Sequence, residues 1–162
     1  MTRVGLISDT HGLLRPEALA FLCGSDYILH AGDIGDAAIL TAIATIAPLT
    51  AVRGNNDTDA WAGKVREVEV VSIDGVSIYL LHDLSLLDVD PIACGHRVVV
   101  TGHSHKPLIE ERSGVLYVNP GSAGPRRFTL PISVGELLID RGSVRARLKT
   151  LDVVAAPKRN II

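Results

Sequence analysis

The sequence is poor in cysteine, in aromatic residues and in long apolar runs. Its 162 residues include 2 cysteines and 1 tryptophan, and aromatic residues make up only 4%. Cys23 and Cys94 match no metal-binding spacing, so we predict two small, buried hydrophobic residues in a reducing compartment rather than a thiolate site. No apolar run approaches the ~20 residues of a membrane helix, and the first run ends at Asp9. These absences predict a cytoplasmic protein with no signal peptide and no membrane partner.

Net charge is also small. The 16 basic and 18 acidic residues give a net charge of -2, so duplex nucleic acid is not an expected partner. Hydrophobic residues make up 47% of the chain and mean hydropathy is +0.30. This aliphatic excess fits a large core, or else a subunit interface in a homo-dimer or tetramer. The length suits one domain over residues 1–162, with a loose C-terminal tail at 157–162.

The first half of the chain alternates strands with helices, whereas the second half contains strands with almost no helix. Pro16 opens the first helix, Asp36 is a good N-cap for the second, and Asp74-Gly75 predicts a hairpin turn. The pattern predicts an α/β (α+β) fold, a four-layer αββα sandwich of two mixed β-sheets flanked by helices. The expected strands are 4–7, 27–29, 49–52, 65–73, 76–81, 98–100, two short ones near 109 and 116, 134–139 and 144–148.

Metal-capable side chains follow five of the predicted strands. Because ligand-binding groups collect at the carboxyl ends of strands, this repetition suggests one shared site. In the pairs Asp9-x-His11 and His103-x-His105 the partners are two residues apart, so in extended backbone each pair can hold one ion. The full set is Asp9, His11, Asp33, Asn55, His82, His103 and His105.

This donor set is too large for one ion. Two ions that share a carboxylate fit better, and mixed oxygen and nitrogen donors without thiolate suit Mn²⁺, Fe, Co²⁺, Ni²⁺ or Zn²⁺ rather than Ca²⁺. We take Mn²⁺ as the first choice. Paired ions ~3.5 to 4 Å apart are a recurring device for hydrolysing phosphate esters. The sequence therefore predicts a dinuclear phosphoesterase.

The motifs resemble, in order and spacing, those of the calcineurin-like metallophosphoesterases. They are Ser8-Asp9-Thr10-His11-Gly12, Gly32-Asp33, Gly54-Asn55-Asn56-Asp57, His82 and Gly102-His103-Ser104-His105. The short length and the segment Asn119-Pro120-Gly121-Ser122 look like the small single-domain phosphodiesterases of the YfcE/MJ0936 type, to which the retromer subunit Vps29 is similar.

The resemblance implies a role for each residue. One metal would be held by Asp9, His11 and His105, the other by Asn55, His82 and His103, with Asp33 bridging them. The residues expected to take part in catalysis are Asp33, Asn55 and His103. The residues expected to bind phosphate are Asn56, Gly121, Ser122 and Arg126.

Two positions depart from the family pattern. Asn56 stands where the family carries His or Cys, so the usual proton donor for a leaving group is missing, and Asp83 stands where the family has Gly. We predict a phosphodiesterase that acts on small phosphodiesters by attack of metal-bound hydroxide. The alternatives are a non-catalytic metal-binding scaffold of the Vps29 type, and a phosphomonoesterase or protein phosphatase.

Overall fold

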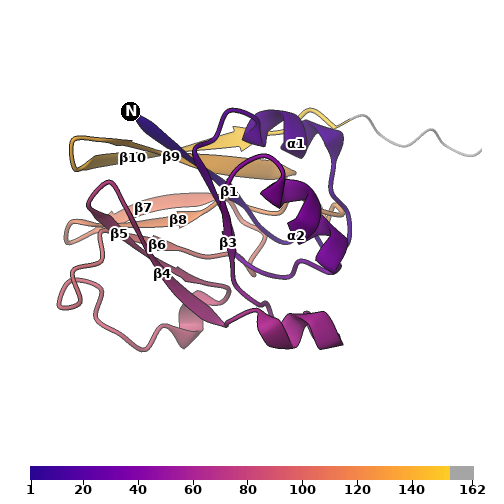
Figure 1. Ribbon diagram of the computed structural model, residues 1–162, viewed down its shortest axis with the longest axis horizontal. Helices are drawn as coiled ribbons and strands as arrows, with labels where there is room; N and C mark the ends of the chain where they lie inside the picture. Colours follow the sequence, from indigo (N-terminus) through magenta and orange to yellow (C-terminus); the bar gives the residue numbers. More distant parts are fainter. Residues whose placement is uncertain (154–162) are drawn as a thin grey trace, which may run out of the picture.

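Two five-stranded mixed sheets lie face to face in the computed structural model, which describes residues 1–153 (Figure 1). The strand orders are β10-β9-β1-β2-β3 and β4-β5-β6-β8-β7. The strands are β1 (Thr2–Ile7), β2 (Tyr27–His30), β3 (Leu49–Ala51), β4 (Val68–Ile73), β5 (Val76–Leu81), β6 (Val98–Val100), β7 (Leu108–Arg112), β8 (Val115–Asn119), β9 (Ser133–Asp140) and β10 (Ser143–Thr150). The helices are α1 (Pro16–Leu22) and α2 (Ala37–Ala44), with 3-10 turns η1 (Ala60–Lys64) and η2 (Leu84–Leu86).

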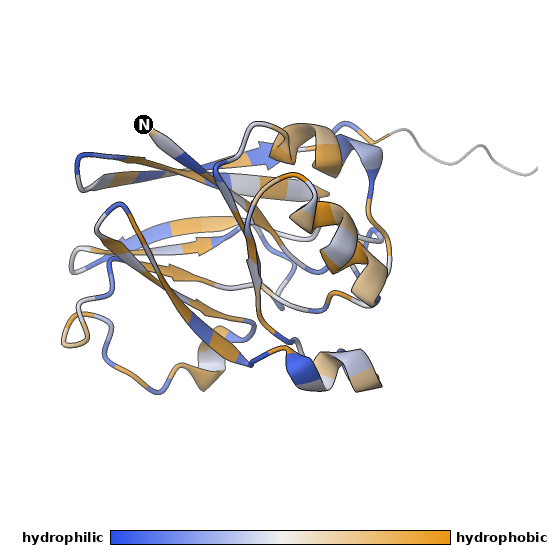
Figure 2. Cartoon of the chain, viewed as in Figure 1, coloured by the Kyte–Doolittle hydropathy of each residue, from blue (hydrophilic) through white to orange (hydrophobic). Residues whose placement is uncertain are grey.

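The main core lies between the sheets. Alternate residues of β1, such as Val4 and Leu6, meet residues of β5 and β6, such as Ile78 and Val98, and all four side chains are fully buried. A second core fills the space between the first sheet and both helices. Figure 2 shows apolar residues along the central strands of both sheets. Because β1, β2 and β3 run parallel, as do β5, β6 and β8, their carboxyl ends collect at one edge of the sandwich.

The helix starts and the hairpin turn predicted from the sequence are found in the structure. Pro16 occupies the start of α1, and the Asp36 side chain accepts a hydrogen bond from the Ala38 amide at 2.9 Å, which caps α2. Asp74 and Gly75 have φ values of 48° and 78° in the turn between β4 and β5. The two-sheet sandwich is confirmed.

The far side of the second sheet differs from the expected helical layer. Both α-helices pack on the first sheet, and the loop that carries η2 covers the centre of the second sheet. Leu84 and Leu87 of this loop pack against Tyr79 and Leu81 of β5. The loop does not extend over the edge strand β4, where Val70 remains 53% exposed.

Three further expectations concern exposure and chain ends. The prediction that Cys23 and Cys94 are buried is wrong, because Cys23 caps the solvent-facing end of α1 and Cys94 lies in a loop. No helix in the described part of the chain is long and apolar enough to cross a membrane. The predicted tail at 157–162 lies outside the described residues.

Candidate metal centre

Seven predicted ligands lie at the edge where the parallel strands end. Each follows a strand closely: Asp9 follows β1, Asp33 follows β2, Asn55 follows β3 and His82 follows β5. His103 and His105 lie in the loop after β6. The topology thus brings together residues that are distant in the sequence.

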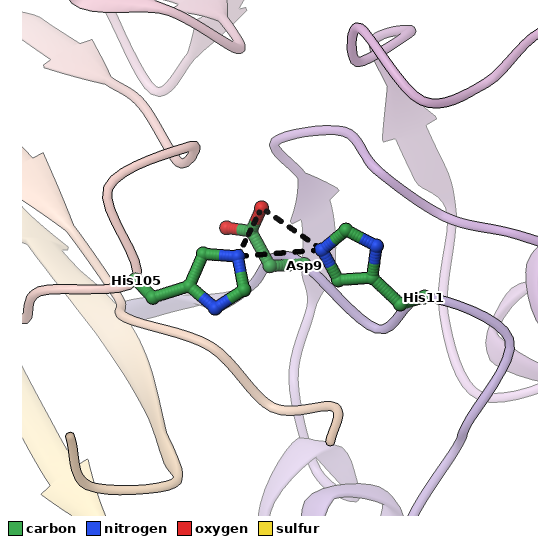
Figure 3. A group of neighbouring side chains, drawn as sticks. All are labelled: Asp9, His11 and His105. Atoms are coloured by element: carbon green, nitrogen blue, oxygen red, sulfur yellow. Dashed lines mark hydrogen bonds and ion pairs between the residues drawn. The ribbon is translucent and has the colours of Figure 1, made fainter. Parts of the chain in front are cut away.

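The first group consists of Asp9, His11 and His105 (Figure 3). Their ligand atoms lie within 4.8 Å of one another. Asp9 Oδ1 is 3.8 Å from His11 Nε2 and 3.4 Å from His105 Nε2, and the two Nε2 atoms are 3.3 Å apart. Three lone-pair-bearing atoms facing one point form a site that fits a divalent cation.

The second group consists of Asp33, His82 and His103, and Asn55 completes it. Asn55 Oδ1 lies 3.0 Å from His82 Nε2 and 3.1 Å from His103 Nδ1. Asp33 Oδ2 is 3.2 Å from His82 Nε2 and 3.7 Å from His11 Nε2. Asp33 therefore touches both groups, which is the position expected of a bridging carboxylate.

The orientation of Asp9 tests whether a cation fits. Its Oδ2 atom accepts hydrogen bonds from Ser8 Oγ at 2.8 Å and from the His103 amide at 3.1 Å. Its Oδ1 atom is buried and has no hydrogen-bond partner among the described residues. A buried, unpaired carboxylate oxygen is costly unless a cation binds it. The donor set of the first group therefore fits a metal.

His82 gives an independent test in the second group. Its Nδ1 lies 2.7 Å from the Ala31 carbonyl oxygen, so Nδ1 carries the proton and donates it there. In the neutral ring, the Nε2 lone pair then faces the oxygens of Asn55 and Asp33. Converging acceptors of this kind need either a proton on Nε2 or a cation between them.

The backbone is bent at most of the ligands. Of the nine non-glycine residues with positive φ in the described chain, five are predicted ligands, a clustering typical of functional sites. The five are Asp9, His11, Asp33, His103 and His105. His103 and His105 consequently face different groups. The ligand atoms of Asp9 and His11 lie in one group, as their two-residue spacing predicts. Those of His103 and His105 lie in different groups, which their spacing did not predict.

Two glycines permit the close approach of these loops. A Cβ atom on Gly102 would overlap Ser8 Oγ and lie 2.8 Å from Asp9 Oδ2. A Cβ atom on Gly54 would overlap the Asp33 side chain and backbone nitrogen. Any side chain at either position would displace a predicted ligand.

The electrostatics favour an ionised Asp33 carboxylate. Burial alone would raise the pKa of Asp33, but hydrogen bonds from His82 and from the Asn56 amide lower it to about 2. Burial would lower the pKa of His82, whereas its contact with Asp33 and the charge of Asp9 raise it. Burial lowers the pKa of His11 despite both carboxylates. The Asp33 carboxylate therefore carries a negative charge that a cation would neutralise.

Asn56 and Asp57 support the site from the loop after β3. The Asn56 amide and its Nδ2 atom donate to the two oxygens of Asp33, at 2.9 Å and 3.1 Å. Asp57 accepts hydrogen bonds from the backbone amides of Ile34, Gly35 and Gly54 at 2.9 to 3.1 Å. Asp57 thus joins the Asp33 loop to the Asn55 loop.

His30 lies next to the centre, is fully buried and makes two structural hydrogen bonds. Its Nδ1 accepts from the Gly32 amide at 3.1 Å, and its Nε2 lies 3.0 Å from Thr10 Oγ1. Because Thr10 Oγ1 donates to the Ile34 carbonyl, Nε2 is the donor in the second contact. Burial lowers the pKa of His30 to about 4.

The residues expected to bind phosphate lie in three different surroundings. Gly121 and Ser122 are buried, with the Gly121 amide donating to Asn119 Oδ1 at 2.9 Å and Ser122 Oγ donating to the Asp9 carbonyl at 3.1 Å. Asn56 contacts Asp33, and the exposed Arg126 lies 3.4 Å from the Leu130 carbonyl. Ser122 thus holds the loop that carries Asp9 in place. That the four residues bind phosphate stays a prediction.

Two further residues support the site: the role of Asn119 was not predicted, whereas Asp83 was singled out as a departure from the family pattern. Asn119 Nδ2 donates to the Gly102 carbonyl at 2.9 Å and to Ser104 Oγ at 3.1 Å, which fixes the loop that carries His103. Asp83 Oδ1 accepts from Ser85 at the start of η2, and its Oδ2 lies 3.8 Å from His103 Nε2. The position of Asp83 directly after His82 was the available signal.

Most of the chain, residues 2–142, matches the family model of the calcineurin-like phosphoesterase superfamily domain. The chain belongs to this superfamily. Its divalent-metal chemistry agrees with the two ligand groups described above.

Individual metallophosphoesterases are similar over most of their length. A probable metallophosphoesterase of Methanothermobacter thermautotrophicus is 35% identical over 158 residues, 90% of each chain. The phosphodiesterase MJ0936 of Methanocaldococcus jannaschii is 27% identical over 137 residues, 74% of this chain and 82% of its own. The solved structure of Vps29 from Entamoeba histolytica complexed with Zn²⁺ has a TM-score of 0.70 and 23% identity, covering 92% of this chain and 99% of its own, a likeness of fold.

Proposed function

We propose that this metallophosphoesterase is a dinuclear phosphodiesterase. The observation that carries the proposal is the pair of ligand groups joined by Asp33, whose Oδ2 lies within 3.7 Å of a histidine from each. Asp9, His11 and His105 would hold one divalent ion, and Asn55, His82 and His103 the other. Mn²⁺ is the first choice for both positions.

The bound ions would supply a hydroxide nucleophile at neutral pH and neutralise charge on the phosphoryl oxygens. The chain's own residues hold that arrangement in place. Ser8 and the His103 amide fix one oxygen of Asp9, and the two nitrogens of Asn56 fix both oxygens of Asp33. A centre fixed in this way does not need to reorganise during the reaction.

Asn56 favours diesters over alkyl phosphomonoesters. Its amide cannot titrate, and both of its nitrogens already donate to Asp33. The centre therefore lacks a proton donor at the family's usual position. A diester with an activated leaving group needs little protonation, so this substrate class suits the residues present. The similarity to a phosphodiesterase, MJ0936, supports the same choice.

Hydrolysis of bis(4-nitrophenyl) phosphate, measured with the Mn²⁺-loaded chain, tests the proposal. We expect turnover that a chelator abolishes and Mn²⁺ restores. His103→Ala should lose more than ~100-fold of kcat/KM, because it removes a predicted ligand. His96→Ala is the matched control, because His96 precedes the start of β6 whereas His103 follows its end.

Other outcomes would favour other functions. Two bound ions without hydrolysis of any phosphate ester would contradict the proposal and favour a non-catalytic scaffold of the Vps29 type. Faster hydrolysis of 4-nitrophenyl phosphate than of the diester would favour a phosphomonoesterase or protein phosphatase.

A further inference from the structure

A pocket of about 300 Å³ adjoins the second ligand group. Asn55 and His82 form the part of its wall that belongs to the metal centre. Val68 of β4 lines the pocket, and so do Leu86 and Asp88 of the loop that covers the second sheet. The pocket is therefore continuous with the place where a phosphoryl group would bind.

The pocket exists because the covering loop stops short of the edge strand. Leu84 and Leu87 of the loop pack on Tyr79 and Leu81, but Val68, which pairs with Leu81 across the strands, stays 37% exposed. Leu86, which also lines the pocket, is 71% exposed. Two apolar side chains thus face solvent beside a highly polar centre.

The charges of the pocket are predominantly negative. Three carboxylates line it, those of Glu67, Asp83 and Asp88, against the single guanidinium of Arg53. Arg53 pairs with Glu67 at 2.9 Å, which leaves the charges of Asp83 and Asp88 uncompensated by any Lys or Arg of the lining. Asp83 Oδ1 accepts hydrogen bonds from Ser85, whereas the Asp88 side chain is exposed. A pocket of this kind repels a second anionic group and attracts a cationic one.

We propose that this pocket binds the alcohol part of the phosphodiester that is not the leaving group, and that this part is an aliphatic chain carrying an ammonium. The proposal rests on the proposed phosphodiesterase function. The chain of the alcohol lies against Val68 and Leu86, and its ammonium faces Asp83 and Asp88. Substrates with a second phosphate or a carboxylate on that group are disfavoured. Asp88 is thus a specificity-determining residue that needs no contact with the reacting atoms.

Three diesters that share a 4-nitrophenyl leaving group test the charge preference. Their second alcohols are 3-aminopropyl, n-butyl and 2-carboxyethyl, so the cation, neutral group and anion are compared at equal leaving-group chemistry. We expect kcat/KM to fall in that order by about threefold to tenfold per step, the range for partly exposed charges. Asp88→Lys should abolish the preference, because the charge of the new lysine would offset that of Asp83. Asp140→Lys makes the same charge change at the opposite edge of the sandwich and should preserve it.

A binding measurement separates the pocket from the reaction. The methyl NMR signals of Leu86 in the Zn²⁺-loaded chain should shift on titration with 3-aminopropyl methyl phosphate, and less in Asp88→Lys. Shifts without turnover of any diester would retain the pocket and overturn the proposed function. Turnover with no charge preference, or with one that Asp88→Lys leaves unchanged, and no shift at Leu86 would overturn the pocket and retain the function.

Discussion

Acid should destabilise the metal-free fold through His30. This side chain is fully buried, and its two ring nitrogens have fixed partners, Gly32 on Nδ1 and Thr10 on Nε2. Protonation of Nδ1 would set two donors, the ring N–H and the Gly32 amide, against each other. The folded state therefore keeps His30 neutral, with a pKa of about 4 against 6.5 for an ordinary histidine.

The sign and size of the effect follow from this difference. As pH falls below 6.5, His30 becomes protonated in the unfolded chain, whereas in the folded chain it stays neutral until about pH 4. Stability is thus intact above the unfolded pKa and is lost between these two values. At about pH 5 the loss due to His30 is about 2 kcal/mol relative to about pH 7.5, and it approaches about 3 kcal/mol below pH 4.

Urea denaturation with a chelator present, at about pH 7.5 and about pH 5, measures this loss. Other groups also titrate, so the relevant quantity is the difference between wild type and His30→Gln. We expect His30→Gln to be less stable at pH 7.5 but to lose about 2 kcal/mol less than wild type on acidification. An equal loss in both proteins would refute the argument.

The remaining predictions concern residues that support the centre. Gly102→Ala should lower the free energy of unfolding by about 1 to 3 kcal/mol and weaken Mn²⁺ binding measured by calorimetry, because its Cβ would overlap Ser8. Gly63→Ala, with nothing within 4 Å of the added Cβ, should change neither, and equal effects of the two would contradict the steric reasoning. Asp57→Asn should cost about 1 to 3 kcal/mol in urea denaturation, because it weakens charge-assisted hydrogen bonds to three backbone amides. Asp59→Asn, an exposed N-cap with no side-chain hydrogen bond, is its control, and a similar loss there would count against a specific role for Asp57.

Much of the fold could be predicted because local signals and tertiary structure agree. Pro16, Asp36 and the Asp74-Gly75 turn act within a few residues of themselves, and the structure uses each as expected. The convergence of the ligands was also predictable, since parallel strands deliver the residues that follow them to one edge.

Features that depend on long-range packing could not be predicted. The family resemblance assigned His103 and His105 to different metals, but the positive φ values of these residues could not be predicted, because nothing in a two-residue spacing signals such a bend. The exposure of Val68 and Val70 in β4 could not be predicted either, because the alternation of residues along a strand does not show which face of the sheet a distant loop will cover. The support by Asn119 likewise depends on β8 lying next to β6.

An anomalous difference map from a crystal soaked in Mn²⁺ would show directly whether the centre is dinuclear. We expect two peaks about 3.5 to 4 Å apart. One should be bound by Asp9, His11 and His105, the other by Asn55, His82 and His103, with the Asp33 carboxylate reaching both. A single peak, or two peaks of which neither contacts Asp33, would contradict this expectation.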